Sequence, residues 1–130
     1  MHRDLLLILA SLLALHAKHF LFDFVFQTGY QLHNKGKYGH PGGLLHAGLH
    51  AAGSIPGILI WPAPTWLLVT LVGSEFLIHY HMDWIKEQVV KKFGWSSHNF
   101  GFWVALGLDQ LVHATTYICM VGVLAVYVPV

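Results

Sequence analysis

Charged residues and cysteine are scarce in this chain of 130 residues. Asp, Glu, Lys and Arg together make up 10% of the sequence, and the seven basic residues form no long cluster. Nucleic-acid binding is therefore not expected, because that function needs a concentrated positive surface. Cys119 is the sole cysteine, which excludes an intrachain disulfide bond.

Two familiar catalytic signatures are also missing. The sequence has no Gly-rich phosphate-binding loop and no Ser-His-Asp order, so it gives no indication of P-loop nucleotide chemistry or of a serine hydrolase triad.

Hydrophobic residues, in contrast, make up 55% of the sequence, and the mean hydropathy is +0.57. They occur in blocks long enough to cross a bilayer, which takes roughly 20 residues of helix. The sequence predicts a single domain over residues 1–130, an all-α integral membrane four-helix bundle with short connections and antiparallel up-down topology. The predicted spans are residues 4–27, 43–61, 65–90 and 100–127.

Local signals separate these spans. Residues 28–42 form a polar stretch that we expect to be a loop, and residues 62–64 (Pro-Ala-Pro) and 95–99 mark the other turns. The first span resembles a signal peptide, but Leu15-His16-Ala17 is a poor cleavage site and the apolar pattern resumes at once. Alternating phenylalanines over residues 20–26 could suggest a strand, yet an isolated strand in lipid would leave its backbone unpaired, so a helix is expected.

The lysines predict the orientation. Lys35, Lys37, Lys91 and Lys92 lie in the first and third connections, with Lys86 nearby, whereas Arg3 is the main basic residue on the other side. Because positive loops stay in the cytoplasm, we expect a multi-pass protein of the cell's inner (cytoplasmic) membrane. Loops one and three would be cytoplasmic and both termini outside.

Histidine is unusually abundant, with eleven residues. Each predicted helix carries one pair of His or Asp residues spaced i, i+4, which places both side chains on one face. The pairs also fall at similar depths, in the cytoplasmic half of the bundle. These eight candidate metal ligands are His19, Asp23, His46, His50, His79, Asp83, Asp109 and His113.

Such imidazole and carboxylate ligands suit a divalent cation, with zinc as the first expectation and manganese or iron as alternatives, in one or two copies. Interhelical hydrogen bonding without a metal is the plain alternative, and haem binding is less favoured because of the nearby aspartates.

Other polar residues could assist such a centre. Glu75, or an aspartate that does not bind metal, is a candidate general base, and Lys35 or Lys86 could neutralise a phosphate. Gln110 could position a substrate or tie two helices together. Lys18 faces away from His19 on a helix, so we expect it to snorkel or to contact another subunit.

The sequence resembles the small bacterial and phage membrane proteins of domain-of-unknown-function family 3307. The matching segments are residues 19–27, Asn34-Lys35, Leu45-His46, His50, residues 79–86 and residues 109–113. The resemblance implies a four-helix membrane domain with His and Asp pairs. The family is also loosely similar to membrane-bound metal-dependent hydrolases.

Three classes of function remain open. One is a metal-dependent hydrolase of a lipid or phosphate-bearing substrate at the cytoplasmic leaflet, with a di-iron oxidation enzyme as a variant. The second is a metal or proton carrier, or a structural metal site. The third is an accessory subunit of a larger membrane complex, and a homo-oligomer is also open.

Overall fold

The computed structural model describes residues 2–128, with side chains from residue 4 onward, and within those residues it contains helices and no strand. The all-α prediction is therefore confirmed. The long helices are α1 (His2–Phe20), α3 (Pro41–Ile58), α4 (Thr65–Phe93) and α5 (Phe100–Tyr127). A π-helical turn, η1 (Leu21–Val25), and a short helix, α2 (Gly29–Asn34), connect α1 to α3.

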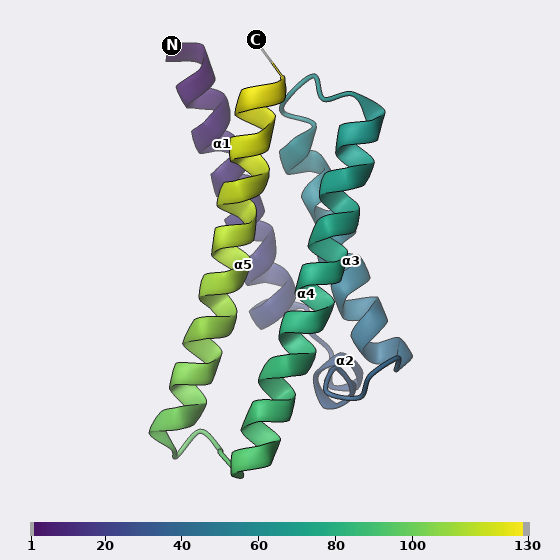
Figure 1. The fold of residues 1–130 in the computed structure, drawn as a ribbon, viewed down its shortest axis with the longest axis vertical. Coiled ribbons are helices and arrows are strands. Elements are labelled where there is room, and N and C mark those ends of the chain that lie inside the picture. The colour runs from purple at the N-terminus through teal and green to yellow at the C-terminus, as the bar shows by residue number, and fades with distance from the viewer. Residues whose placement is uncertain (1, 129–130) are drawn as a thin grey trace.

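The four long helices run alternately up and down, so that both chain ends lie at one end of the molecule and the α4–α5 connection at the other (Figure 1). Helix α1 packs against α3 and α5, and α4 packs against the same two helices. The long helices thus form a four-membered ring with α1 and α4 on its diagonal.

Backbone signals in the sequence explain most helix boundaries. Pro64 has an extended backbone and precedes α4, while Gly94 adopts a left-handed φ of 63° and ends that helix. Helix α5 occupies the predicted residues, and α4 continues three residues beyond the predicted end at position 90.

The prediction of a loop over residues 28–42 was wrong for its first half, where α2 forms. A capping box starts this helix: the Gln31 amide donates to Thr28 Oγ1 over 3.4 Å, and the Thr28 amide donates to Gln31 Oε1 over 2.9 Å. Two otherwise unpaired backbone donors are satisfied in this way. Helix α2 packs against α3.

The half of the bundle nearest the termini holds an apolar core. Its largest members are fully buried, and Trp61 donates its indole N–H to Ser11 Oγ over 2.9 Å. The core consists of Leu15, Ile58, Trp61, Leu67, Leu71, Tyr117, Met120, Val121, Leu124 and Val128.

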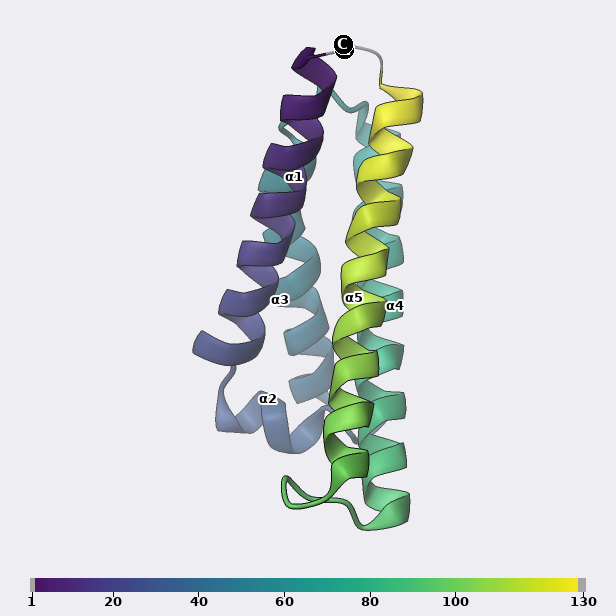
Figure 2. The same ribbon diagram turned by 90° about the vertical axis from the view of Figure 1, so that its left-hand side faces the viewer.

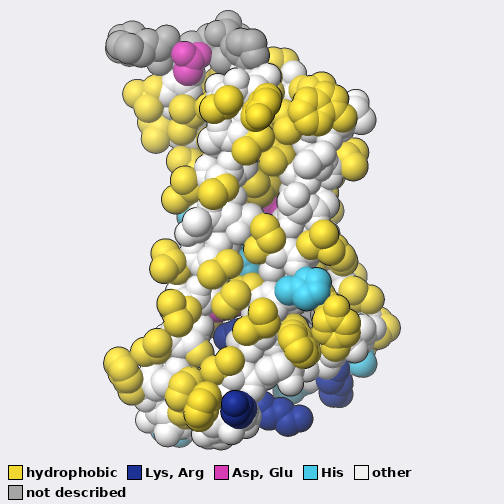
Figure 3. Space-filling view, viewed as in Figure 1, with side chains coloured by type: hydrophobic (Ala, Val, Ile, Leu, Met, Phe, Trp, Pro, Cys, Tyr) yellow, Lys and Arg dark blue, Asp and Glu magenta, His cyan; other side chains and the backbone are white. Residues whose placement is uncertain are grey.

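The outer surface is also apolar. Large hydrophobic side chains such as Leu13, Phe100 and Val126 are 72%, 84% and 76% exposed, and apolar side chains cover much of the face in Figure 3. Within the described residues, Asp4–Val25 and Phe100–Tyr127 are long and apolar enough to cross a membrane. Helices α3 and α4 do not reach the same hydropathy, because they carry glycines, histidines and charged residues along their lengths.

Candidate metal centre

Three helices present an i, i+4 pair to the interior of the bundle at one level. His46 and His50 come from α3, His79 and Asp83 from α4, and Asp109 and His113 from α5. All six side chains are at most 2% exposed. The structure therefore brings the predicted pairs together, as their common face and depth required.

The fourth pair lies where α1 changes to η1. His19 is in the last turn of α1, and Asp23 is in the π-helical turn, which closes with a hydrogen bond from the Phe26 amide to the Leu21 carbonyl over 2.8 Å. A π-turn holds one more residue than an α-turn and is frequent at functional sites. This wider turn carries Asp23 to the histidines of α3.

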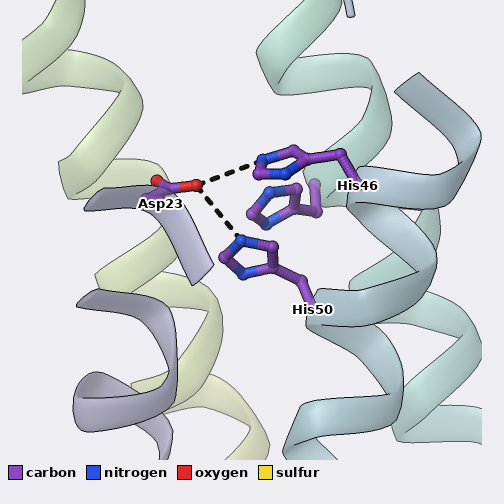
Figure 4. Close-up of side chains that lie close together, drawn as sticks. Asp23, His46 and His50 are labelled. Atoms are coloured by element: carbon purple, nitrogen blue, oxygen red, sulfur yellow. Dashed lines mark ion pairs between the residues drawn. The ribbon is translucent and has the colours of Figure 1, made fainter. Parts of the chain in front are cut away.

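Asp23 is the centre of the first ligand set. Its Oδ1 atom lies 3.1 Å from Nε2 of His46 and 3.1 Å from Nε2 of His50, and both imidazoles point toward it (Figure 4). Together with His79, these residues offer ligand atoms that all lie within 4.8 Å of one another.

The second ligand set shares His79 with the first and adds Asp83 and His113, again with ligand atoms within 4.8 Å of one another. Nε2 of His113 lies 3.7 Å from Asp83 Oδ1 and 3.3 Å from Asp109 Oδ1. The rings of His50, His79 and His113 form a continuous stack, with centroid separations of 3.9 and 4.1 Å.

Many polar atoms of these two sets have no hydrogen-bond partner among the described residues. Asp23 Oδ1 makes no hydrogen bond even though two histidine nitrogens lie 3.1 Å away. His50 Nε2 and His113 Nε2 also have no hydrogen-bond partner, although each lies near a carboxylate oxygen. Both carboxylate oxygens of Asp83 and both ring nitrogens of His79 are also unpaired. Buried polar atoms are nearly always paired, so this concentration requires an explanation.

The distances fit ligands that share an ion. Two atoms bound to one ion at about 2.0–2.2 Å lie roughly 2.8–3.6 Å apart at octahedral or tetrahedral angles. The 3.1 Å separations around Asp23 fall within that interval. The residues present therefore fit a divalent cation in their donor types, their spacing and their lack of other partners.

Polar neighbours fix the orientation of several candidate ligands. Gln110 Oε1 accepts a hydrogen bond from His19 Nε2 over 2.9 Å, and Gln110 Nε2 donates to Asp23 Oδ2 over 3.1 Å. Gln110 thus ties α5 to α1 and η1, which is one of the two roles expected of it. Tyr117 contacts His19 Nδ1 over 3.0 Å. Such partners commonly fix the tautomer of a ligating imidazole.

The prediction for Lys18 was wrong. Lys18 is only 8% exposed, forms an ion pair with Glu75 on α4 and donates to the His50 carbonyl over 2.9 Å. The helical wheel correctly separates Lys18 from His19, but it does not reveal that α4 supplies a carboxylate on that side. Glu75, which is 1% exposed, is therefore buried in an ion pair with Lys18.

The other two lysines singled out in the sequence lie close to the centre. Lys35 Nζ is 3.5 Å from Asp83 Oδ2, and Lys86 Nζ is 2.8 Å from Glu87 Oε1. Both side chains are largely buried, at 5% and 9% exposure.

A cavity of about 680 Å³ adjoins the centre. It reaches Asp23, Asp109 and Gln110 on the inside, and its wall includes Lys35 and Lys86. Its lining residues come from η1, α2, the last turns of α4 and the first half of α5. These segments lie toward the end of the molecule opposite the termini (Figure 2). The histidines of the centre are therefore buried, and the centre can be reached through the cavity.

Neither the curated proteins nor the solved structures include a match to the chain. A family model does match, over residues 8–129, and its description is "Protein of unknown function (DUF3307)". The match spans nearly the whole sequence and agrees with the resemblance of its motifs, so the chain belongs to this family.

Proposed function

We propose that this chain is a multi-pass protein of the cytoplasmic membrane and a metal-dependent hydrolase that acts on a membrane-associated substrate. The observation that carries the proposal is a cluster of His and Asp side chains, many of whose buried polar atoms have no hydrogen-bond partner, that adjoins a cavity rather than being sealed on all sides.

The distribution of side chains supports the membrane part of the proposal. Among the described residues, as many polar or charged residues as hydrophobic ones are buried, while large hydrophobic side chains cover the outside. Ionisable side chains in membrane helices characteristically face the bundle interior and pair there. We propose that α3 and α4 also span the bilayer, shielded by α1 and α5 and paired through their own polar residues.

The charge distribution supports the orientation. Lysine side chains gather at the end opposite the termini on the face shown in Figure 3, and that end includes α2 and the α4–α5 connection. Positive loops remain cytoplasmic. In our proposal the cavity therefore opens toward the cytoplasmic leaflet.

The two ligand sets support a centre with two ions. Asp23, His46 and His50 would hold one ion, and Asp109 and His113 the other. His79 lies between the two sets, and the two oxygens of Asp83 face different sets, which suits a bridging carboxylate. Zinc is the first candidate, and manganese and iron accept the same donors.

A bound divalent ion supplies hydrolysis with a water of lowered pKa and polarises a phosphoryl or carbonyl oxygen. The residues of the chain would bind and orient the substrate. Gln110 reaches the cavity and would orient the substrate beside the centre, and Lys35 and Lys86 would neutralise negative charge. Glu75 is not retained as general base, because Lys18 holds it and it does not line the cavity.

A carrier of metal ions or protons is less well supported. A through-pathway would have to continue toward the termini, where Leu15, Ile58 and Leu124 are fully buried in an apolar core. A structural metal site is also less well supported, because such sites are closed, whereas this one adjoins the cavity.

Metal analysis and turnover of the detergent-purified protein test the proposal together. Wild type should contain a divalent metal and hydrolyse a chromogenic phosphate or acyl ester in a metal-dependent way. The double variant His46→Ala, His50→Ala should lose both properties, whereas His98→Ala, in an exposed loop, should lose neither.

Equal metal content in wild type and the double variant would overturn the centre. Bound metal without turnover of any ester, combined with flux of the metal or of protons in proteoliposomes, would overturn the hydrolase and favour the carrier.

A further inference from the structure

The cavity beside the centre has an unusually basic wall. Four of the chain's seven basic residues line it, namely Lys35, Lys37, Lys86 and Lys91. They come from the α2–α3 connection and from the last turns of α4, so two separate segments place cations around one space.

The carboxylates in the wall do not balance these lysines. Asp23 and Asp109 line the cavity, but their oxygens face the histidines of the centre. Glu87 is the remaining acid, and it pairs with Lys86. Four lysines thus line the cavity against one acid that is not directed at the centre, and this excess of positive charge, which does not depend on bound metal, would be offset by an anionic ligand.

Two of these lysines are held in place. Lys35 is 5% exposed and lies 3.5 Å from Asp83, and Lys86 is 9% exposed. The connection that carries Lys35 and Lys37 is fastened to α4 by a hydrogen bond from Gln88 Nε2 to the Gly36 carbonyl over 2.7 Å. Lys35 and Lys86 therefore form a fixed part of the wall, whereas Lys37 and Lys91 are exposed at its rim.

The remaining wall is apolar and continues to the outer surface. Phe24, Leu32, Phe102 and Leu106 line the cavity, and Phe24 and Leu32 are also 59% and 49% exposed. An apolar chain attached to a headgroup in the cavity could leave sideways over these residues. A small soluble anion would not contact these apolar residues.

We propose that the cavity binds the phosphate group of an amphiphilic substrate, with its apolar chain lying over Phe24 and Leu32. The inference rests on the proposed function for the reaction, since the phosphate would lie beside the metal centre. The binding itself depends on the lysines and can be measured without the metal.

The experiment uses the full chain in detergent after removal of metal by a chelator. Binding of short-chain phosphatidic acid is compared with that of short-chain phosphatidylcholine, a neutral diacylglycerol and inorganic phosphate. Phosphatidic acid should bind best. Lys35→Gln and Lys91→Gln should each weaken it, by about tenfold for the buried Lys35, because bonds to charged groups contribute most when water is excluded.

Lys92→Gln provides the matched control, because Lys92 neighbours Lys91 but does not line the cavity. Lys91 is exposed, so its variant keeps the test valid if Lys35→Gln fails to fold. Unchanged binding in both cavity variants, or equal binding of the neutral lipid, would overturn the proposal. Equal binding of inorganic phosphate would overturn the amphiphilic part and identify a soluble phosphate as the ligand.

The two proposals can fail separately. Loss of metal binding in the tests of the centre would leave lysine-dependent phosphate binding intact. Absence of phosphate binding in a protein that still contains metal and hydrolyses acyl esters would reject this inference alone.

Discussion

Nε2 of His46 and Oδ2 of Asp83 lie 3.1 Å apart across the interface between α3 and α4. The second oxygen of the same carboxylate, Oδ1, lies 3.7 Å from Nε2 of His113 on α5. Neither Asp83 oxygen has a hydrogen-bond partner among the described residues. A single carboxylate thus faces histidines of both ligand sets, which is the geometry expected of a residue that bridges two ions.

Asp83→Asn should therefore lower the metal content from about two ions per chain to about one or fewer, because a neutral amide replaces the shared anionic ligand. The measurement is metal analysis by plasma mass spectrometry on protein purified in detergent. Asp4→Asn, at the far end of α1, is the control. Full metal content in Asp83→Asn would show that Asp83 does not bridge.

His79→Ala should weaken metal binding by at least about a hundredfold, since outer partners of metal ligands already contribute up to that amount and His79 belongs to both ligand sets. His81→Ala is a close control on the same helix: His81 is exposed and contacts Tyr38 over 3.2 Å. Competition with a chromogenic chelator measures both affinities. Equal affinities in the two variants would contradict a shared role for His79.

Much of this arrangement could be predicted because its causes are local. The i, i+4 spacing fixes a common face on a helix, and prolines and glycines fix helix ends, so α5 and the start of α4 fall at the predicted residues. The capping box of α2 is also local. Thr28 and Gln31 have the spacing of a capping box in the sequence itself. This pattern indicates a helix start more strongly than the surrounding polar residues indicate a loop.

The remainder depends on contacts between distant segments. The sequence of residues 21–25 alone does not specify a π-turn. The turn is stabilised by the contact of Asp23 with His46 on α3. The partner of Lys18 is likewise set by the packing of α1 in the ring of helices. One signal was available: a buried lysine and a buried glutamate at similar depth each need an opposite charge, and Lys18 and Glu75 supply it to each other.

Removal of either partner of this ion pair should destabilise the protein. Lys18→Met leaves the Glu75 carboxylate buried without its cation, and breaking a buried pair in this way costs about 3–5 kcal/mol. The double variant Lys18→Met, Glu75→Leu should recover much of that loss. Unfolding free energies in mixed micelles give the double-mutant cycle, and strictly additive effects would show that the two residues do not interact.

Gly42→Ala should disturb the basic wall from a distance. A Cβ at Gly42 would lie 2.9 Å from the Tyr30 carbonyl oxygen and 2.9 Å from Asn34 Cβ, so α2 would have to move, at a cost of about 1–3 kcal/mol for overpacking. Because Lys35 follows α2 directly, the variant should also bind phosphatidic acid more weakly.

Gly48→Ala is the matched control for this change, since it lies on the same helix and its Cβ would meet only Phe76 at 4.0 Å. Stability and lipid binding should remain at wild-type values there. Wild-type lipid binding in a destabilised Gly42→Ala would show that the position of α2 does not control the cavity.

Cysteine labelling tests the proposed orientation. In a Cys119→Ser background, which removes the native thiol, Lys37→Cys probes the end that carries the cavity and Ala63→Cys probes the turn between α3 and α4. Because the lysines should retain their end of the bundle in the cytoplasm, an impermeant maleimide should label Ala63→Cys on intact cells. Lys37→Cys should react only after the membrane is opened. The reverse pattern would place the cavity outside, and equal labelling of both positions on intact cells would contradict a bundle that spans the bilayer.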